Sequence, residues 1–326
     1  MIEDIVKNRV IGVDISIDRT SYAIVDVRGN IIARDGLNTQ DYATATDYVS
    51  ALSEKVVMLA EENGGYEYIR SMGISSPSAN YRTGCIENAP NLHWKGIVPM
   101  AAMLRDRMGI AVALANDAHV TALGEHTYGA AHGMNNFIVM SLGHGIGSCI
   151  FSNGKVHLGS EGFAGEVGHT CAVPDGRICG CGKKGCMEAY CGAKGIVLTA
   201  QEIMAESNKP SLMRHADRLT PKIIHEFCKQ GDELAMEVFR RTGKMLGFVM
   251  AGYASILDPE AIIFTGGIAR AGNYLLLPAH DEFEAHVFHN TRGHVKFLVS
   301  ALEDHERDVL GASALAWGIK EYSLFK

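Results

Sequence analysis

Two halves of this 326-residue chain carry the same order of short apolar runs and turns. In the first half, two runs lie within residues 9–27, and Arg28-Gly29-Asn30 forms a turn that leads into a third run at residues 31–34. Residues 136–158 repeat this order, with Ser152-Asn153-Gly154 as the turn. Segments with helical spacing of apolar residues alternate with further strands after each set. The sequence therefore predicts an α/β protein of two domains with a ligand cleft between them.

No linker rich in proline or serine separates the two halves, and the domain boundary is expected near residues 117–123. The last predicted helix, residues 308–322, contains several small residues that allow close packing. We expect this helix to return to the first domain. The prediction is an N-terminal domain of residues 1–120 that is completed by residues 308–326, and a C-terminal domain of residues 121–307.

The composition argues against several classes of protein. A net charge of −7 disfavours a nucleic-acid-binding surface, which needs clustered lysine and arginine. Charged residues within residues 1–14 interrupt the apolar run that a signal peptide requires, and no long window is continuously apolar as a membrane span would be. Eight cysteines, most of them scattered, fit a reducing compartment. We therefore expect a cytoplasmic protein with neither nucleic acid nor a membrane among its partners.

A glycine-rich segment, residues 169–188, concentrates three of the cysteines. Cys179, Cys181 and Cys186 have the spacing C-x-C-x₄-C, and the glycines beside them permit the tight turns that bring three sulfur atoms to one point. With the imidazole of His169 they complete the Cys₃His set of a structural Zn²⁺ site. The alternative is a glycine-rich loop with free thiols. We expect the metal to clamp this loop and to fix the polar side chains on its flanks for a ligand.

Two glycine-rich turns follow apolar strands in the second half. The first contains Gly143, Gly145 and Gly147, which let backbone N–H groups approach anionic oxygens. The second, Thr265-Gly266-Gly267, opens a helix after a buried strand, a geometry typical of anion and nucleotide sites. Glycine is common in turns for conformational reasons alone, which is the alternative. The presence of two such turns favours a nucleotide site.

Asp117 follows the apolar strand at residues 111–115, close to the predicted boundary. A carboxylate at the end of a buried strand can take a proton from a substrate hydroxyl. The alternative is that Asn116 or Asp117 only caps the next helix. Polar residues around the metal loop and in an upstream Pro-Asn-Leu segment favour the first interpretation, because they offer the amide and charged acceptors that a sugar requires. These residues are Asn91, Glu166, His169 and Glu188.

The chain resembles, nearly end to end, the ROK family of sugar kinases and sugar-responsive repressors, in the actin/hexokinase/Hsp70 ATPase superfamily. The specific matches are residues 87–94 (ENAPNLHW), Asn116-Asp117-Ala118, residues 164–169, and the cysteine triplet with Glu188. The resemblance implies two actin-like ATPase domains of the ribonuclease H-like type, with the C-terminal helix returning to the first. We expect a homodimer or a dimer of dimers.

The family's residue roles carry over onto this sequence. By the resemblance, Asp117 is the catalytic base for transfer of the ATP γ-phosphoryl group to a hexose hydroxyl, with Mg²⁺ on the phosphates. The implied hexose contacts are Asn91, Asn116, Glu166, His169 and Glu188. The implied Zn²⁺ ligands are His169, Cys179, Cys181 and Cys186. The implied nucleotide contacts are Asp14, Gly143, His144, Gly145, Gly147, Gly266 and Gly267. Glucose is the expected sugar, and N-acetylated hexosamines, mannose, allose and fructose are alternatives.

The first phosphate loop departs from the family pattern. Where the family has D-x-G-G-T, this chain has Asp14-Ile15-Ser16-Ile17-Asp18, and in the second loop His144 replaces a threonine. Ile17 puts a β-branched side chain where the backbone should approach phosphate, and Asp18 adds a negative charge. We expect a working glucokinase-like enzyme. The alternatives are a sugar-binding sensor that has lost catalysis and a kinase for another phosphoryl donor. A DNA-binding repressor is disfavoured, because the first predicted strand begins near Arg9 and leaves no room for a helix-turn-helix.

Overall fold

The computed structural model describes residues 6–89, 92–303 and 306–319. Contacts between residues divide the chain into two compact units. Unit 1 comprises Met1–His132, Gly159–Gly162 and Ala301–Lys326, and unit 2 comprises Gly133–Leu158 and Phe163–Ser300. Unit 1 therefore extends past residue 120, where the sequence analysis places the boundary. The reason is that helix α3 (Asp117–Tyr128) packs against helix α9 (Arg307–Trp317) inside this unit.

Unit 1 is built on a mixed five-stranded sheet in the order β3-β2-β1-β4-β8. The strands are β1 (Arg9–Ile15), β2 (Arg19–Asp26), β3 (Ile31–Asn38), β4 (Ile69–Ser75) and β8 (Ala111–Ala115). The first three form an antiparallel meander, whereas β4 and β8 continue the sheet parallel to β1. The carboxyl ends of β1, β4 and β8 consequently meet at one edge, where Asp14 pairs with Ser75 and Ser75 pairs with Ala115. A small antiparallel sheet comprises β5 (Ala79–Asn80), β6 (Cys85–Glu87) and β7 (Ile97–Val98).

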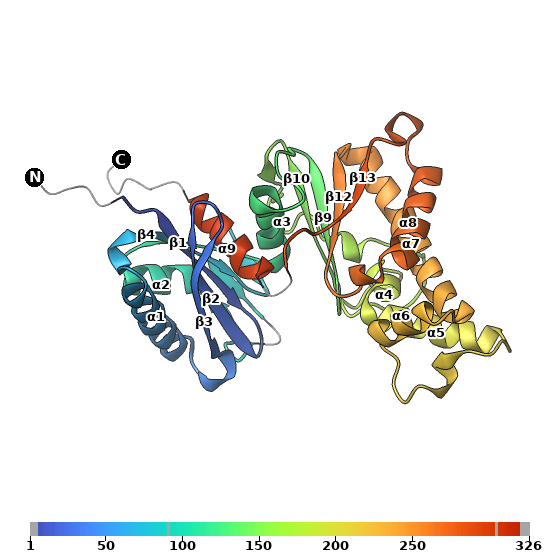
Figure 1. The fold of residues 1–326 in the computed structure, drawn as a ribbon, viewed down its shortest axis with the longest axis horizontal. Coiled ribbons are helices and arrows are strands. Elements are labelled where there is room, and N and C mark those ends of the chain that lie inside the picture. Colours follow the sequence, from blue (N-terminus) through green and yellow to red (C-terminus); the bar gives the residue numbers. More distant parts are fainter. Residues whose placement is uncertain (1–5, 90–91, 304–305, 320–326) are drawn as a thin grey trace, which may run out of the picture. The chain divides into compact units, whose positions relative to one another are not determined.

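Helices pack on both faces of this sheet (Figure 1). Alternate residues of a strand point to opposite faces, so Ile11 and Val13 of β1 join a core with α1 (Ala45–Glu62) and α2 (Met100–Met108). Val10 belongs to a separate cluster with residues of α9. Because α9 packs on β1 and β4, the C-terminal helix returns to the first unit, as the sequence predicted.

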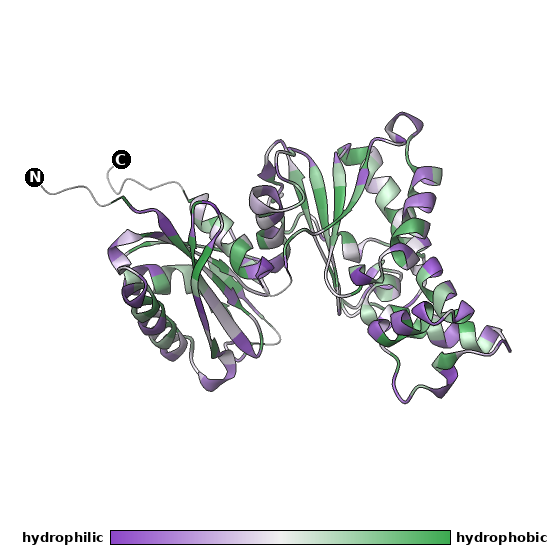
Figure 2. Cartoon of the chain, in the orientation of Figure 1, coloured by the Kyte–Doolittle hydropathy of each residue, from purple (hydrophilic) through white to green (hydrophobic). Residues whose placement is uncertain are grey.

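Unit 2 repeats the topology of unit 1 on a sheet in the order β11-β10-β9-β12-β13. The strands are β9 (Phe137–Leu142), β10 (Ile146–Ser152), β11 (Lys155–Val156), β12 (Ala261–Thr265) and β13 (Lys296–Val299). The first three are again antiparallel, and β12 and β13 run parallel to β9. In Figure 2 the strands of this sheet are mostly hydrophobic, in accord with their burial. The predicted repeat is thus confirmed, although the third strand, β11, is shorter than the sequence suggested.

Five α-helices complete the described part of unit 2. They are α4 (Glu188–Cys191), α5 (Ala193–Glu206), α6 (Pro221–Lys229), α7 (Glu233–Leu257) and α8 (Asn273–His286). Asp232 caps the start of α7 by accepting the N–H groups of Leu234 and Ala235. The helix is closed by its C-cap Asp258, which has a left-handed φ of 44° and precedes Pro259. In the described part of the chain, no helix combines the length and apolar character needed to cross a membrane.

Candidate functional site

The metal-loop segment of unit 2 folds as a short hairpin-like loop. It begins with the turn η3 (Val167–His169) and ends at α4, and its two sides meet in isolated bridges that pair Cys171 with Cys186 and Ile178 with Lys184. At the tip, the N–H of Gly182 donates to the carbonyl of Cys179 at 3.0 Å. Gly182 has a φ of 86°, a left-handed conformation that favours glycine. The glycines therefore do what the sequence analysis required of them, which is to fold the chain back within a few residues.

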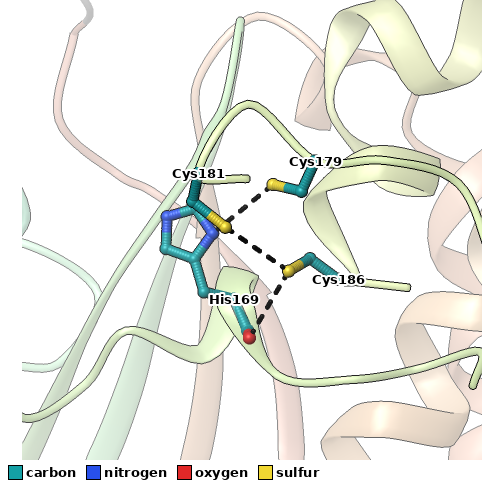
Figure 3. Close-up of side chains that lie close together, drawn as sticks. All are labelled: His169, Cys179, Cys181 and Cys186. Atoms are coloured by element: carbon teal, nitrogen blue, oxygen red, sulfur yellow. Dashed lines mark hydrogen bonds between the residues drawn. The ribbon is translucent and has the colours of Figure 1, made fainter. Parts of the chain in front are cut away.

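The four predicted zinc ligands converge in this loop (Figure 3). Their nearest ligand atoms all lie within 4.8 Å of one another. The Sγ atoms of Cys181 and Cys186 are 3.7 Å apart, and Cys179 Sγ lies 3.6 Å from Nδ1 of His169. A tetrahedral Zn²⁺ with bonds of about 2.3 Å to sulfur and about 2.0 Å to nitrogen requires separations of about 3.8 Å and about 3.6 Å. The side chains thus fit a tetrahedral zinc site in both donor chemistry and spacing.

Glu188 connects the metal loop with the β9–β10 turn. Its Oε2 accepts the N–H of Ile146 at 2.9 Å, and its Oε1 accepts the thiol of Cys179 at 3.3 Å. A Cβ atom on Gly145 would lie 2.5 Å from Glu188 Oε2, so only glycine allows this approach. Gly145, which the sequence analysis assigned to the nucleotide, therefore serves to seat Glu188. On the other flank, Glu166 is exposed and immediately precedes η3.

An arginine that the sequence analysis missed fastens the metal loop to unit 2. The guanidinium of Arg177 donates to the carbonyls of Ala189 and Gly195 at 3.3 and 2.9 Å. It also donates to Thr199 and pairs with Glu202, and it lies 4.6 Å from the centre of the Tyr190 ring. Its side chain is only 15% exposed. The only sequence signal is a lone arginine within a glycine-rich loop, which does not reveal carbonyl partners in α4 and α5.

A pocket of about 930 Å³ lies beside the first glycine turn of unit 2. Three of the residues predicted to contact nucleotide line it, namely Gly143, His144 and Gly267. The remaining lining includes the basic residues Lys194, Arg218, Lys222 and Arg270, and its size suits a nucleotide. Gly145, Gly147 and Gly266 are not among its lining residues. Gly266 has a φ of 86°, and a Cβ there would lie 2.5 Å from the carbonyl oxygen of Leu142, which gives this glycine a conformational role.

In unit 1 the structure separates the two interpretations of the Asn116-Asp117 pair. Asn116 is the cap of α3, because its Oδ1 accepts the N–H of His119 at 2.9 Å. Asp117 is the first residue of the helix. Asp117 as a whole residue is exposed, but partial burial of its carboxylate raises the pKa of that group. The cap interpretation therefore applies to Asn116, and Asp117 does not supply that cap.

The pKa of Asp14, near the end of β1, is raised to about 7. Burial of the carboxylate is the largest cause, and the charges of Asp308 and Asp117 raise the pKa further. The hydroxyl of Ser16 opposes the shift by donating to Asp14 Oδ2 at 2.9 Å. Asp308 was not a candidate in the sequence analysis. Its residue number gives no hint that it lies near Asp14 or Asp117.

The departures in the first phosphate loop have partners within unit 1. The loop closes as a turn in which the N–H of Ser16 donates to the carbonyl of Arg19 at 3.1 Å. Asp18 accepts the side-chain amide of Gln40 at 2.7 Å, and Gln40 in turn meets the ring of His93 at 3.2 Å. Asp18 is thus held by a neutral amide. The predicted sugar contact Asn91, two residues before His93, lies outside the described residues.

Comparison with known proteins extends over both units. The profile of the ROK family matches residues 10–319. A glucokinase from Halalkalibacterium halodurans is 30% identical over 320 residues, which cover 95% of this chain and 94% of the relative. An N-acetylmannosamine kinase from Escherichia coli is 29% identical over 312 residues, covering 95% and 99%. The crystal structure of a ROK family glucokinase from Streptomyces griseus, in complex with glucose and AMPPNP, matches with a TM-score of 0.74 and 31% identity, covering 95% of this chain and 99% of that one. These matches and the shared strand order confirm the predicted pair of actin-like α/β domains.

Proposed function

Since the chain belongs to the ROK family, we propose that it is a hexose kinase that transfers the γ-phosphoryl group of ATP to a sugar hydroxyl. The observation that carries the proposal is that Asn116 and Asp117 have different roles at the start of α3. Asn116 caps α3, and Asp117 begins that helix at the carboxyl end of β8 with a raised pKa. A base with a raised pKa accepts a proton more readily near neutral pH.

The proposed reaction is an in-line displacement at phosphorus. Asp117 accepts the proton of the sugar hydroxyl as that oxygen forms a bond to the γ-phosphorus. The bond between the γ-phosphorus and the bridging oxygen breaks, and ADP leaves with the electron pair. Mg²⁺ would screen the negative charge of the phosphates. The pocket lined by Gly143, His144 and Gly267 is the proposed nucleotide site, because its basic residues and its volume suit ATP.

The metal loop has a structural part in this proposal. Zn²⁺ held by His169, Cys179, Cys181 and Cys186 would cross-link the loop and contribute no chemistry to the transfer. Nδ1 of His169 faces Cys179, so ligation through this atom leaves Nε2 available to a sugar hydroxyl. This arrangement reconciles the two roles predicted for His169. Glu166 and Glu188, at the two flanks of the loop, are proposed to bind further hydroxyls, together with Asn91 and Asn116.

We propose glucose as the sugar, because the glucokinase from H. halodurans and the one from S. griseus match over nearly the whole chain. N-acetylmannosamine is the main competitor, since a kinase for that sugar is almost as similar. A sugar-binding sensor without catalysis is a second candidate function. It is favoured by the phosphate loop, where Ile17 and Asp18 stand in place of glycine and threonine and Ile17 is 39% exposed.

A coupled assay of ADP release across a panel of hexoses tests these proposals. The panel contains glucose, mannose, fructose, allose, N-acetylglucosamine and N-acetylmannosamine, with calorimetric titration of each sugar in parallel. ATP-dependent turnover that is fastest with glucose supports the proposal. Turnover fastest with an N-acetylated sugar changes the substrate and leaves the chemistry intact. Tight binding of a sugar without ADP release would establish the sensor.

A further inference from the structure

The metal loop contains a fourth cysteine, Cys171, that does not belong to the four clustered ligands. Cys171 is exposed, whereas the ligand Cys186 is fully buried. A bound Zn²⁺ would engage the thiols of Cys179, Cys181 and Cys186, and would leave the thiol of Cys171 free. The susceptibility of a cysteine to oxidation rises with the exposure of its sulfur. The loop therefore places an accessible, oxidisable thiol beside the predicted metal site.

The backbone sets Cys171 directly opposite Cys186, with which it forms an isolated antiparallel bridge. The hydrogen bonds of this bridge join the residues on either side of the two cysteines, from the N–H of Ala172 to the carbonyl of Gly185 at 2.7 Å and from the N–H of Met187 to the carbonyl of Thr170 at 3.0 Å. This pattern defines a non-hydrogen-bonded pair, in which the Cα atoms lie about 4.5 Å apart and the side chains share one face. A disulfide accepts Cα separations of roughly 4.4 to 6.8 Å, so the backbone already meets its requirement.

The two sulfur atoms lie on the same part of the loop. A Cβ atom on Gly185, the neighbour of Cys186, would lie 3.2 Å from Cys171 Sγ. The Sγ of Cys186 donates at 3.6 Å to the carbonyl of His169, two residues before Cys171 (Figure 3). Each sulfur thus lies beside the opposite side of the loop. Rotation of the two side chains can bring the sulfur atoms together without a change in the backbone.

We propose that Cys171 and Cys186 are a peroxide-sensitive pair, and that their oxidation to a disulfide releases Zn²⁺ from the metal loop. The sulfur of Cys171 attacks one oxygen of hydrogen peroxide, the O–O bond breaks, and a sulfenic acid forms as water leaves. The thiolate of Cys186 leaves the metal and attacks that sulfur, so that the S–S bond forms and the S–O bond breaks. The departing hydroxide takes up a proton. Both sulfur atoms are then oxidised, and the peroxide is reduced to two molecules of water.

The disulfide would withdraw one of the four ligands of a closed zinc site and leave His169, Cys179 and Cys181. The loop also positions Glu188, which follows Cys186 by two residues and contacts Cys179 Sγ at 3.3 Å. The inference rests on the proposed function for its purpose, because Glu188 is a proposed sugar contact. Oxidation would release this side chain and weaken sugar binding reversibly. A transient disulfide of this kind suits the reducing compartment that the cysteine content favours.

Zinc release and peptide mapping test the site without any turnover. The zinc-loaded full chain is treated with hydrogen peroxide, the released zinc is measured with a colorimetric chelator, and the disulfides are mapped by mass spectrometry. We expect release of about one Zn²⁺ per chain together with a disulfide that joins Cys171 to Cys186. A thiol reductant with added Zn²⁺ should reverse both changes. The glucose dissociation constant, measured by calorimetry, should rise by roughly 3–10-fold on oxidation.

Cys171→Ser is the decisive variant, because it should keep its zinc under the same treatment. Cys85→Ser is the matched control, since Cys85 is a partly exposed cysteine of unit 1 outside the metal loop. It should lose zinc like the natural chain. Zinc content and melting temperature of the reduced proteins guard against misfolding, and they should be equal in Cys171→Ser and the natural chain.

Several outcomes would overturn the inference. It is wrong if the natural chain keeps its zinc in peroxide, or if Cys171→Ser loses zinc as fast as the natural chain. It is also wrong if the mapped disulfide joins Cys181 to Cys186, whose sulfur atoms lie 3.7 Å apart. Zinc release with the expected disulfide, in a chain that phosphorylates no sugar, would uphold the oxidation site and refute the kinase proposal. Sugar phosphorylation by a chain that keeps its zinc in peroxide would do the reverse.

Discussion

The metal loop of unit 2 and the cluster of three carboxylates in unit 1 are assembled in opposite ways. All four metal-loop ligands lie within residues 169–186 and are brought together by local turns at glycine. The carboxylates Asp14, Asp117 and Asp308 come from the beginning, the middle and the end of the chain. They are brought together by the backbone packing of α9. The first site therefore depends on local turns, whereas the second depends on the fold of the whole unit.

The two regions also differ in the contacts that their side chains make. In the metal loop, thiol, imidazole and carboxylate groups already contact one another at 3.3 to 3.7 Å. In unit 1, the charges of Asp308 and Asp117 raise the pKa of Asp14, and Asp308 contacts Arg307 at 3.4 Å. Changes in unit 1 should therefore affect catalysis more than stability. Changes in the metal loop should affect stability and sugar affinity more than the chemical step.

The largest expected effect is the loss of turnover when Asp117 of unit 1 is replaced. Asp117→Asn should lower kcat by about 10²–10⁴-fold, because the amide cannot accept the proton of the sugar hydroxyl. The dissociation constant of the sugar, measured by calorimetry, should change much less. Asp281→Asn in unit 2 is the control for a simple loss of charge. Turnover by Asp117→Asn at close to the natural rate would show that this residue is not the base.

Removal of the metal should have the next largest effect, and on different quantities. We expect about one Zn²⁺ per chain by elemental analysis, and loss of most of it in Cys181→Ser. Metal removal should lower the melting temperature by roughly 5–10 °C, because thiolate ligation contributes folding free energy. It should also weaken sugar binding, since the loop seats Glu188.

Cys171→Ser is the matched control for the metal loop. Cys171 is exposed, and its backbone forms a β-bridge with that of Cys186 across the loop. It is not one of the four clustered ligands. Its replacement should leave zinc content and melting temperature unchanged. Equal zinc content in Cys181→Ser and the natural chain would mean that the four side chains are not the metal site, and would remove the contrast between the two regions.

Loss of the Arg177 side chain should separate positioning from metal binding. Arg177→Met keeps much of the apolar stem but removes the bonds to the carbonyls of Ala189 and Gly195. We expect a rise in the sugar KM of roughly 3–10-fold with kcat and zinc content nearly unchanged, corresponding to about 1 kcal/mol. Arg214→Met is the control, because Arg214 also donates to backbone carbonyls of unit 2, at Ser207 and Lys209. A KM equal in both variants would deny Arg177 a role in the sugar site.

The smallest expected effect concerns nucleotide affinity. Substituting Ser16→Gly, Ile17→Gly and Asp18→Thr together should tighten ATP binding by about threefold to tenfold, because it removes a β-branched side chain and a negative charge. Calorimetry at fixed Mg²⁺ measures the change, and sugar affinity should stay the same. Gln40→Ala controls for loss of the Asp18–Gln40 bond. Tight ATP binding by the natural chain that is lost in the triple variant would identify Asp18 as a working ligand.

Several features could be predicted from the sequence because short-range rules produce them. The short apolar runs, with turns between them, indicated both meanders, and each turn lies within a few residues of the strands it joins. The C-x-C-x₄-C spacing indicated the metal loop for the same reason. At Asn116-Asp117, the sequence offered a cap and a catalytic base as alternatives. The structure assigns the cap to Asn116, and the catalytic role of Asp117 stays a prediction.

Tertiary structure alone decided which distant residues meet. Nothing in the sequence around Asp308 distinguishes it from any acidic residue at the start of a helix, and only the contacts of α9 at Gly12, Gly73 and Gly311 place it near Asp14. The partners of Arg177 in α4 and α5, and the fit of Glu188 over Gly145, likewise depend on packing between elements. The physical reason is that turn chemistry and metal-ligand spacing act over a few residues. Close backbone packing instead depends on two surfaces that the chain brings together only after it has folded.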